Sequence, residues 1–221
     1  MATRAHASGA PCPRFAPALR RSWGLPILLA LLSMPVLVLV CVIAPASAAA
    51  AEAVPATMLA AAIDHGGGPE VLSSHRLAVP KPGAGQVLIA VHAAGVAVWD
   101  AAARQDAGAG AHFPLVLGTD GSGIIAAIGA GVRGFKVGDA VYGAVEGLPS
   151  GFYAQYVVTA AEDVARIPKG IGFAQAGILA VSGLSALQGI DDALQLKAGD
   201  TLIIHGASGA VGTLAVQFAK L

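Results

Sequence analysis

The chain has 221 residues and a formal net charge of zero. After Ala48 it carries nine lysines and arginines against thirteen aspartates and glutamates, with no basic cluster interleaved with aromatic residues. Nucleic-acid binding is therefore not indicated. Both cysteines, Cys12 and Cys41, precede residue 51. This placement excludes disulfides, thiolate zinc sites and a cysteine nucleophile from the rest of the chain.

Residues 1–51 have the composition of a secretory signal peptide. Four arginines and no acidic residue precede Glu52, and an uncharged apolar stretch covers residues 27–44. An Ala-Ser-Ala cleavage pattern follows at residues 46–48, so we expect a cleaved leader and an exported protein. Two alternatives stay open. The stretch could remain as an uncleaved membrane anchor, or translation could start at Met58, which would make the protein cytoplasmic.

From residue 54 to about residue 170 the sequence predicts a β-rich domain. Short apolar segments recur at intervals of roughly 8–12 residues between glycine and proline turns, which is typical of a small barrel or sandwich. The segment 86–94 is apolar at both alternating sets of positions, so we predict a central strand there. The other candidate segments are 58–64, 113–118, 124–128, 140–144 and 152–159.

The character of the sequence changes after Pro168. Residues 173–179 and 181–188 have helical patterns, and residues 191–196 continue as a short helical turn. We therefore divide the chain near residue 170 into the β-rich domain and an α/β region.

The last twenty-one residues carry the clearest functional motif. Residues 202–204 form an apolar run that predicts a strand, and apolar residues from position 211 onwards recur at helical spacing. Strand, glycine-rich turn and helix in this order begin a dinucleotide-binding unit. Glycine lets the backbone approach a pyrophosphate, and the start of the helix attracts the anion. An ordinary tight turn is the alternative, because Ala207 replaces the first glycine of the usual pattern.

The predicted cofactor-binding residues of this turn are Gly206, Ala207, Ser208, Gly209, Ala210, Val211 and Gly212. We expect Ser208 to contact phosphate. A second strand with a ribose-reading residue, about 20 positions further on, does not follow. We therefore expect a truncated dinucleotide-binding domain that is poorly stabilised from about Thr201 onwards and binds its cofactor weakly.

Four segments resemble the medium-chain dehydrogenase/reductase superfamily, and among its branches the zinc-independent quinone oxidoreductases. They are residues 67–72, 113–118, 135–143 and 203–209, and they occur in the family's order. The resemblance implies a mixed α/β fold. A GroES-like β-rich barrel domain would cover residues 54–170. Hinge helices and the first βα unit of a Rossmann domain would cover residues 171–221.

The resemblance also implies an activity. Zinc-dependent members carry Cys and His where this chain has Ala97 and Thr119, and neither of these residues can bind zinc. A zinc-independent enzyme is implied, in which a reduced nicotinamide cofactor, NADP(H) in preference to NAD(H), transfers hydride to a quinone, enone or related carbonyl. The implied partners are a small-molecule substrate and a second copy in a homodimer. A non-catalytic GroES-like module that binds a partner or small molecule is the alternative.

Individual site residues follow from the same resemblance. Asp100 matches the family's Asp at the end of the loop after the central strand and is the one catalytic candidate, with a helix cap as the alternative. Ser185 matches a hydroxyl near the nicotinamide, with a helix contact as the alternative. Structural roles are expected for four further residues, namely His92, Asp139, Tyr153 and His205.

Overall fold

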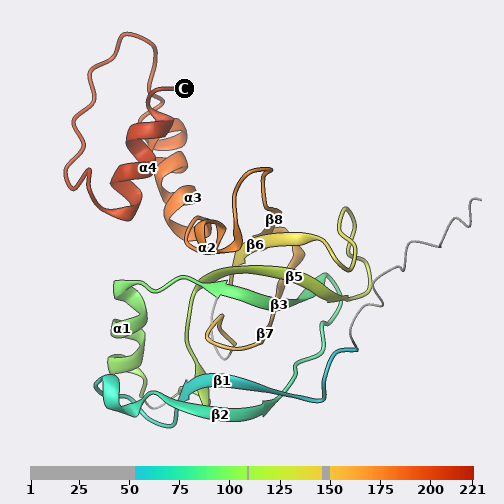
Figure 1. Ribbon diagram of the computed structural model, residues 1–221. Coiled ribbons are helices and arrows are strands. Elements are labelled where there is room, and N and C mark those ends of the chain that lie inside the picture. Colours follow the sequence, from blue (N-terminus) through green and yellow to red (C-terminus); the bar gives the residue numbers. More distant parts are fainter. Residues whose placement is uncertain (1–52, 109, 146–149) are drawn as a thin grey trace, which may run out of the picture. The chain divides into compact units, whose positions relative to one another are not determined.

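The computed structural model describes residues 53–221, except residue 109 and residues 146–149 (Figure 1). The predicted leader, residues 1–51, lies outside these residues. Within the described ranges, no helix combines the length and the apolar character that crossing a bilayer requires.

Antiparallel pairing organises the described strands into two sheets. The smaller sheet has the order β2-β1-β4, and the larger sheet has the order β7-β3-β5-β6-β8. In Figure 1, β1 and β2 lie below β3 and β5. The strands are β1 (Thr57–Ile63), β2 (Ser73–Ala78), β3 (Gln86–Ala94), β4 (Leu115–Val116), β5 (Asp120–Ile128), β6 (Ala140–Ala144), β7 (Tyr156–Ala160) and β8 (Val164–Arg166).

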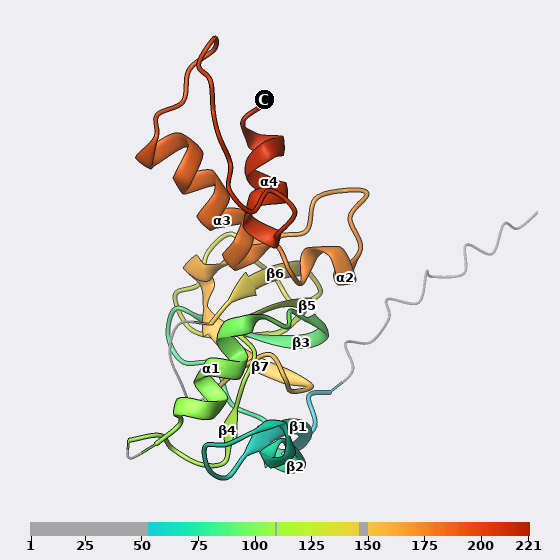
Figure 2. The same ribbon diagram turned by 90° about the vertical axis from the view of Figure 1, so that its left-hand side faces the viewer.

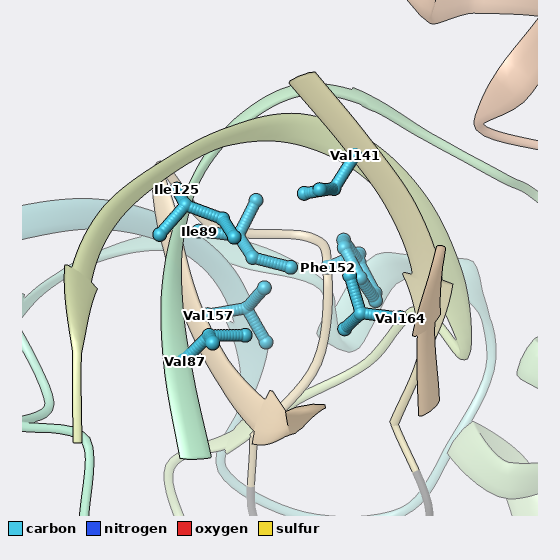
Figure 3. Packing of buried hydrophobic residues seen from close by; sticks show 7 residues of the cluster. All are labelled: Val87, Ile89, Ile125, Val141, Phe152, Val157 and Val164. Atoms are coloured by element: carbon cyan, nitrogen blue, oxygen red, sulfur yellow. The ribbon is translucent and has the colours of Figure 1, made fainter. Parts of the chain in front are cut away.

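The largest core cluster lies on the concave side of the larger sheet (Figure 3). Its buried members are Val87, Ile89, Ile125, Val141, Phe152, Val157 and Val164. Each such side chain contributes roughly 1.5–3 kcal/mol when it leaves water. Leu88 lies between Val87 and Ile89 and is also buried, but outside this cluster. β3 is thus covered on both faces and pairs with β5 and β7, as the sequence predicts for a central strand.

Helices follow the β-rich part and also interrupt it. They are α1 (Val98–Asp106), α2 (Phe173–Ala176), α3 (Ala180–Gln188) and α4 (Ala210–Phe218). Short 3₁₀ turns occur at Pro69–Val71 and Ala161–Asp163, and a π-helical turn at Gly189–Ala193 extends α3. α3 and α4 lie side by side in both views (Figures 1 and 2) and bury Ala186, Ile190 and Ala215 between them.

Two side-chain hydrogen bonds link β5 to the helices that follow the β-rich part. The buried Ser122 hydroxyl on β5 donates to the Phe173 carbonyl oxygen at the start of α2, at 2.6 Å. The Asp120 carboxyl at the start of β5 accepts the Val181 N–H in the first turn of α3, at 3.4 Å. The end of β5 at which both side chains lie therefore faces the hinge helices.

The strand predicted at residues 202–204 is not formed. A strand is defined by pairing with a neighbour, and no described strand pairs with this segment. The alternation expected of a strand is nevertheless visible, because Leu202 and Ile204 pack against the α3–α4 cluster while Ile203 is 78% exposed. The helix predicted at residues 173–179 is also shorter, ending at Ala176.

Candidate functional site

A pocket of about 640 Å³ opens between the loop after β3 and the hinge helices. Its lining residues are Gly95, Val96, Ala97, Val98, Trp99, Asp120, Ile178, Ser182 and Ala210. The wall is mainly aliphatic and aromatic, and a carboxyl, a hydroxyl and an indole are the polar side-chain groups among these residues. A mainly apolar enclosure with a few polar groups is the usual form of a small-molecule site.

Gly95 holds one side of this pocket together. Its N–H donates to the backbone oxygen of Asp120 at 2.9 Å. A Cβ atom at this position would lie 2.2 Å from Asp120 Oδ1 and 2.9 Å from the Gly177 carbonyl oxygen. The loop after β3, the start of β5 and the segment after α2 therefore meet at a point where a larger residue does not fit.

Asp120 is the ionisable residue among those that line the pocket. The residue is 4% exposed, and burial raises the pKa of its carboxyl, with the nearby Asp100 carboxylate as a smaller cause in the same direction. The hydrogen bond from Val181 opposes this shift. The raised pKa favours the protonated form of the Asp120 carboxyl, which is a hydrogen-bond donor.

Asp100, the predicted catalytic candidate, is 7% exposed and does not line this pocket. Its carboxylate accepts the Ala97 N–H at 2.8 Å, which caps the start of α1. It also accepts the Tyr153 hydroxyl at 3.1 Å and the Thr119 hydroxyl at 3.4 Å. These contacts correspond to the helix-cap interpretation, and a catalytic role for Asp100 stays a prediction.

Tyr153 is more than a packing residue. Its ring packs against the buried side chains of the smaller sheet, while its hydroxyl donates to Asp100. Burial first, and the Asp100 carboxylate second, raise the pKa of Tyr153 well above its ordinary value. The hydroxyl consequently stays a donor throughout the physiological pH range.

The predicted serine and the pocket serine differ by one turn of α3. Ser185 is exposed, and its hydroxyl donates to the Val181 carbonyl oxygen of the same helix at 2.8 Å. Ser182 is instead 4% exposed and lines the pocket. Ser182, Asp120 and Trp99 are pocket residues that the sequence did not single out.

The glycine-rich turn has the geometry of a phosphate cradle. Gly206 has a φ of +71°, and its carbonyl oxygen accepts the Gly209 N–H at 2.9 Å. A Cβ on Gly212 would lie 2.3 Å from the Gly206 oxygen, so the helix approaches the turn this closely only with glycine there. Residues 206–211 are exposed, and α4 begins directly after Gly209. The turn therefore fits an anionic pyrophosphate on chemical grounds.

The cradle and the pocket meet at Ala210. This residue is the first of α4 and also lines the pocket wall. The other predicted turn residues, Gly206 to Gly209 with Val211 and Gly212, lie outside the pocket lining. A dinucleotide bound by its phosphates at the turn would thus begin at the edge of the pocket.

Comparison with known proteins identifies the family. Residues 83–169 match the alcohol dehydrogenase GroES-like domain. Human quinone oxidoreductase is 37% identical over 158 residues, which cover 70% of this chain and 47% of the human protein. The solved quinone oxidoreductase from Coxiella burnetii is 34% identical, with a TM-score of 0.65 over 74% of this chain and 53% of that one. The chain belongs to the medium-chain dehydrogenase/reductase superfamily.

Within this superfamily the chain is similar to the quinone oxidoreductases. A mycobacterial relative solved in complex with NADPH is 30% identical, with a TM-score of 0.65 over 74% of this chain and 50% of that one. The chain spans about half the length of the curated relatives it matches. The GroES-like domain and the partial Rossmann unit expected from the sequence agree with these findings.

The sequence predicts that this chain binds no catalytic zinc, because Ala97 and Thr119 cannot be zinc ligands. In the structure Ala97 lies in the pocket wall, and the Thr119 hydroxyl donates to Asp100. No group of three His, Cys, Asp or Glu side chains suited to a metal ion occurs among the described residues. Zinc independence stays a prediction that rests on the residue types at these two positions.

Of the remaining predicted residues, His92 and Asp139 have structural contacts, and His205 is exposed. The His92 ring stacks on Phe173 of α2 with the ring centroids 4.3 Å apart. Asp139 lies between Lys136 and Arg166, and hydrogen bonding to Lys136 first, then to Arg166, lowers its pKa to about 2. His205 is exposed beside the glycine-rich turn.

Proposed function

We infer that this chain is part of an NADPH-dependent oxidoreductase that passes a hydride to a quinone, an enone or a related carbonyl compound without zinc. The observation that carries this proposal is the meeting of the phosphate cradle and the apolar pocket at Ala210. Hydride transfer requires the nicotinamide and its acceptor in one enclosure from which water is largely excluded.

The cofactor assignment rests on the glycine-rich turn and on the similarity to a relative solved with NADPH. The exposed backbone of residues 206–209 and the first N–H groups of α4 would hold the pyrophosphate, which fits the open N-terminus of that helix. The relative solved with NADPH supports NADP(H) over NAD(H). When bound, the reduced nicotinamide would supply the hydride, and the chain would supply position and electrostatics.

The acceptor assignment rests on the pocket wall. Val96 and Val98 are each largely exposed along the rim, and Trp99 offers an aromatic surface beside them. Quinone-reducing relatives usually carry an Asn where this chain has Ala97, so no amide contacts the acceptor from that position. The wall therefore suits a flat, apolar acceptor whose polar end reaches the Asp120 carboxyl and the Ser182 hydroxyl of the pocket lining.

Cofactor binding is tested by titrating the whole chain with NADPH and following the nucleotide's fluorescence. Gly212→Ala would place a methyl group 2.3 Å from the Gly206 oxygen and is expected to weaken NADPH binding at least about tenfold. Gly189→Ala is the matched control, because a Cβ there meets nothing within 4 Å. Equal affinity of both variants would refute the cradle. Failure of the unmodified chain to bind NADPH would favour the alternative of a non-catalytic GroES-like module.

A further inference from the structure

The Asp120 carboxyl is buried with little to stabilise its charge. Among the described residues it has no ion pair. Its carboxyl accepts the Val181 N–H at 3.4 Å, near the outer limit for such a bond, and its own backbone N–H. Its Oδ1 atom packs against Gly95, where a Cβ would lie 2.2 Å from it. The Asp120 side chain is nevertheless among the residues that line the pocket.

Two titratable groups, Asp100 and Tyr153, lie near Asp120. The Asp100 carboxylate, held by α1, raises the pKa of Asp120. The Tyr153 hydroxyl donates to Asp100 at 3.1 Å. When it is protonated, the Asp120 carboxyl presents an O–H donor to the pocket, and burial extends the protonated form to a higher pH than in an exposed aspartate.

Ser182 supplies a second donor in the same enclosure. It is buried in α3, lines the pocket, and its hydroxyl makes no hydrogen bond with the described residues. The other lining side chains are Val96, Ala97, Val98, Trp99 and Ile178. The protonated Asp120 carboxyl and the Ser182 hydroxyl can therefore both donate hydrogen bonds to a molecule in this mainly apolar pocket.

We propose that Asp120 and Ser182 bind the carbonyl oxygen of the hydride acceptor, and that Asp120 is the catalytic acid that protonates this oxygen. The proposal rests on the function inferred above. A hydride from the reduced nicotinamide dinucleotide forms a C–H bond at the conjugated carbon of the acceptor. The electron pair of the π bond moves to the carbonyl oxygen, which takes the Asp120 proton as the Asp120 O–H bond breaks. Solvent water returns a proton to the carboxylate.

Binding is tested without any cofactor. Replacing Trp23, the other tryptophan of the chain, by phenylalanine leaves Trp99 as the sole tryptophan. Quenching of Trp99 fluorescence then reports the affinity for a naphthoquinone between about pH 4 and pH 9. We expect the affinity to fall as the pH rises through the Asp120 pKa, because the carboxylate cannot donate. Asp120→Asn keeps a donor and should bind independently of pH, whereas Ser182→Ala should bind about fivefold more weakly at every pH.

The proton transfer is tested by the rate of NADPH-dependent quinone reduction by the same variants. Asp120→Asn cannot give up a proton, so its kcat should fall about 100-fold while its quinone affinity is kept. Asp106→Asn is the control, because Asp106 is exposed at the end of α1. Circular dichroism of each variant checks that it is folded.

The outcomes separate the acid role from the proposed function. Unchanged turnover of Asp120→Asn would overturn the acid role even if the protein reduces quinones. If quinone binding keeps its pH dependence in Asp120→Asn, or is unaffected by Ser182→Ala, these two residues do not bind the carbonyl oxygen. Quinone binding that depends on both residues, without NADPH-dependent turnover by the unmodified chain or any variant, would support the proposed binding roles of Asp120 and Ser182 and refute the reductase function.

Discussion

Gly95 provides a direct test of how the pocket is built. In Gly95→Ala the new Cβ would lie 2.2 Å from Asp120 Oδ1, whereas ordinary van der Waals contact begins near 3.4 Å. The neighbour on the other side is the Gly177 backbone oxygen at 2.9 Å, which cannot rotate away as a side chain can. Overpacking of this kind typically costs 1–3 kcal/mol. We therefore expect Gly95→Ala to lower the free energy of unfolding by about 2 kcal/mol.

A double-mutant cycle assigns this cost to the contact with Asp120. Urea unfolding of the single variants Gly95→Ala and Asp120→Ala and of the double variant gives the coupling free energy. Removing the carboxyl removes the closest clash, so the Gly95→Ala penalty should shrink by at least about 1 kcal/mol in the Asp120→Ala background. Gly189→Ala is the control, since its Cβ meets nothing within 4 Å. Strict additivity, or a Gly95→Ala penalty below about 0.5 kcal/mol, would refute the packing described here.

Three further predictions concern the charged groups. Because the folded-state pKa of Asp120 is raised above 3.8, its contribution to stability is lost as the pH rises through the folded value. Asp120→Asn should therefore be more stable than the unmodified chain near neutral pH, and urea titrations at several pH values that showed no gain would contradict this. Asp139 has its pKa lowered to about 2, so stability is lost as the pH falls from about 4 towards 2. Asp139→Asn should abolish that loss in an acid titration followed by circular dichroism. Tyr153→Phe removes a hydrogen bond to Asp100 and should cost about 1 kcal/mol in urea unfolding, with equal stability counting against that bond.

The sequence predicted those strands that a core fixes from both sides. β3 was found with its bounds because both of its faces are apolar. The segment 140–144 was also found as β6, whereas β5 begins at Asp120, four residues before the predicted segment 124–128. β2 was not predicted from the sequence, because it is an edge strand without buried residues and its sequence therefore lacks an apolar alternation. The segment 202–204 shows the opposite error, since an apolar run predicts a strand only where a partner strand is present to pair with it.

The sequence points to the proposed cofactor half of the site and does not single out the residues of the proposed acceptor half. The glycine turn is local in sequence, and the positions of Gly206 and Gly212 carry the chemistry of the cradle directly. Asp120 comes to line the pocket only through the packing of α3 near β5, which is a long-range contact that leaves no local signature. Its one sequence signal was an acidic residue directly before a glycine-rich apolar strand. The resemblance singles out Ser185, whereas Ser182, one helical turn earlier, lines the pocket, and Ser185 stays a prediction.

The most direct test of the central claim is the oxidation of NADPH in the presence of a naphthoquinone, measured on the protein at the length at which it occurs in its own cells. We predict quinone-dependent oxidation of NADPH that is lost in Gly212→Ala and retained in Gly189→Ala. A protein that binds neither NADPH nor quinone, or a rate unaffected by Gly212→Ala, would contradict the account of a hydride-transfer site at Ala210.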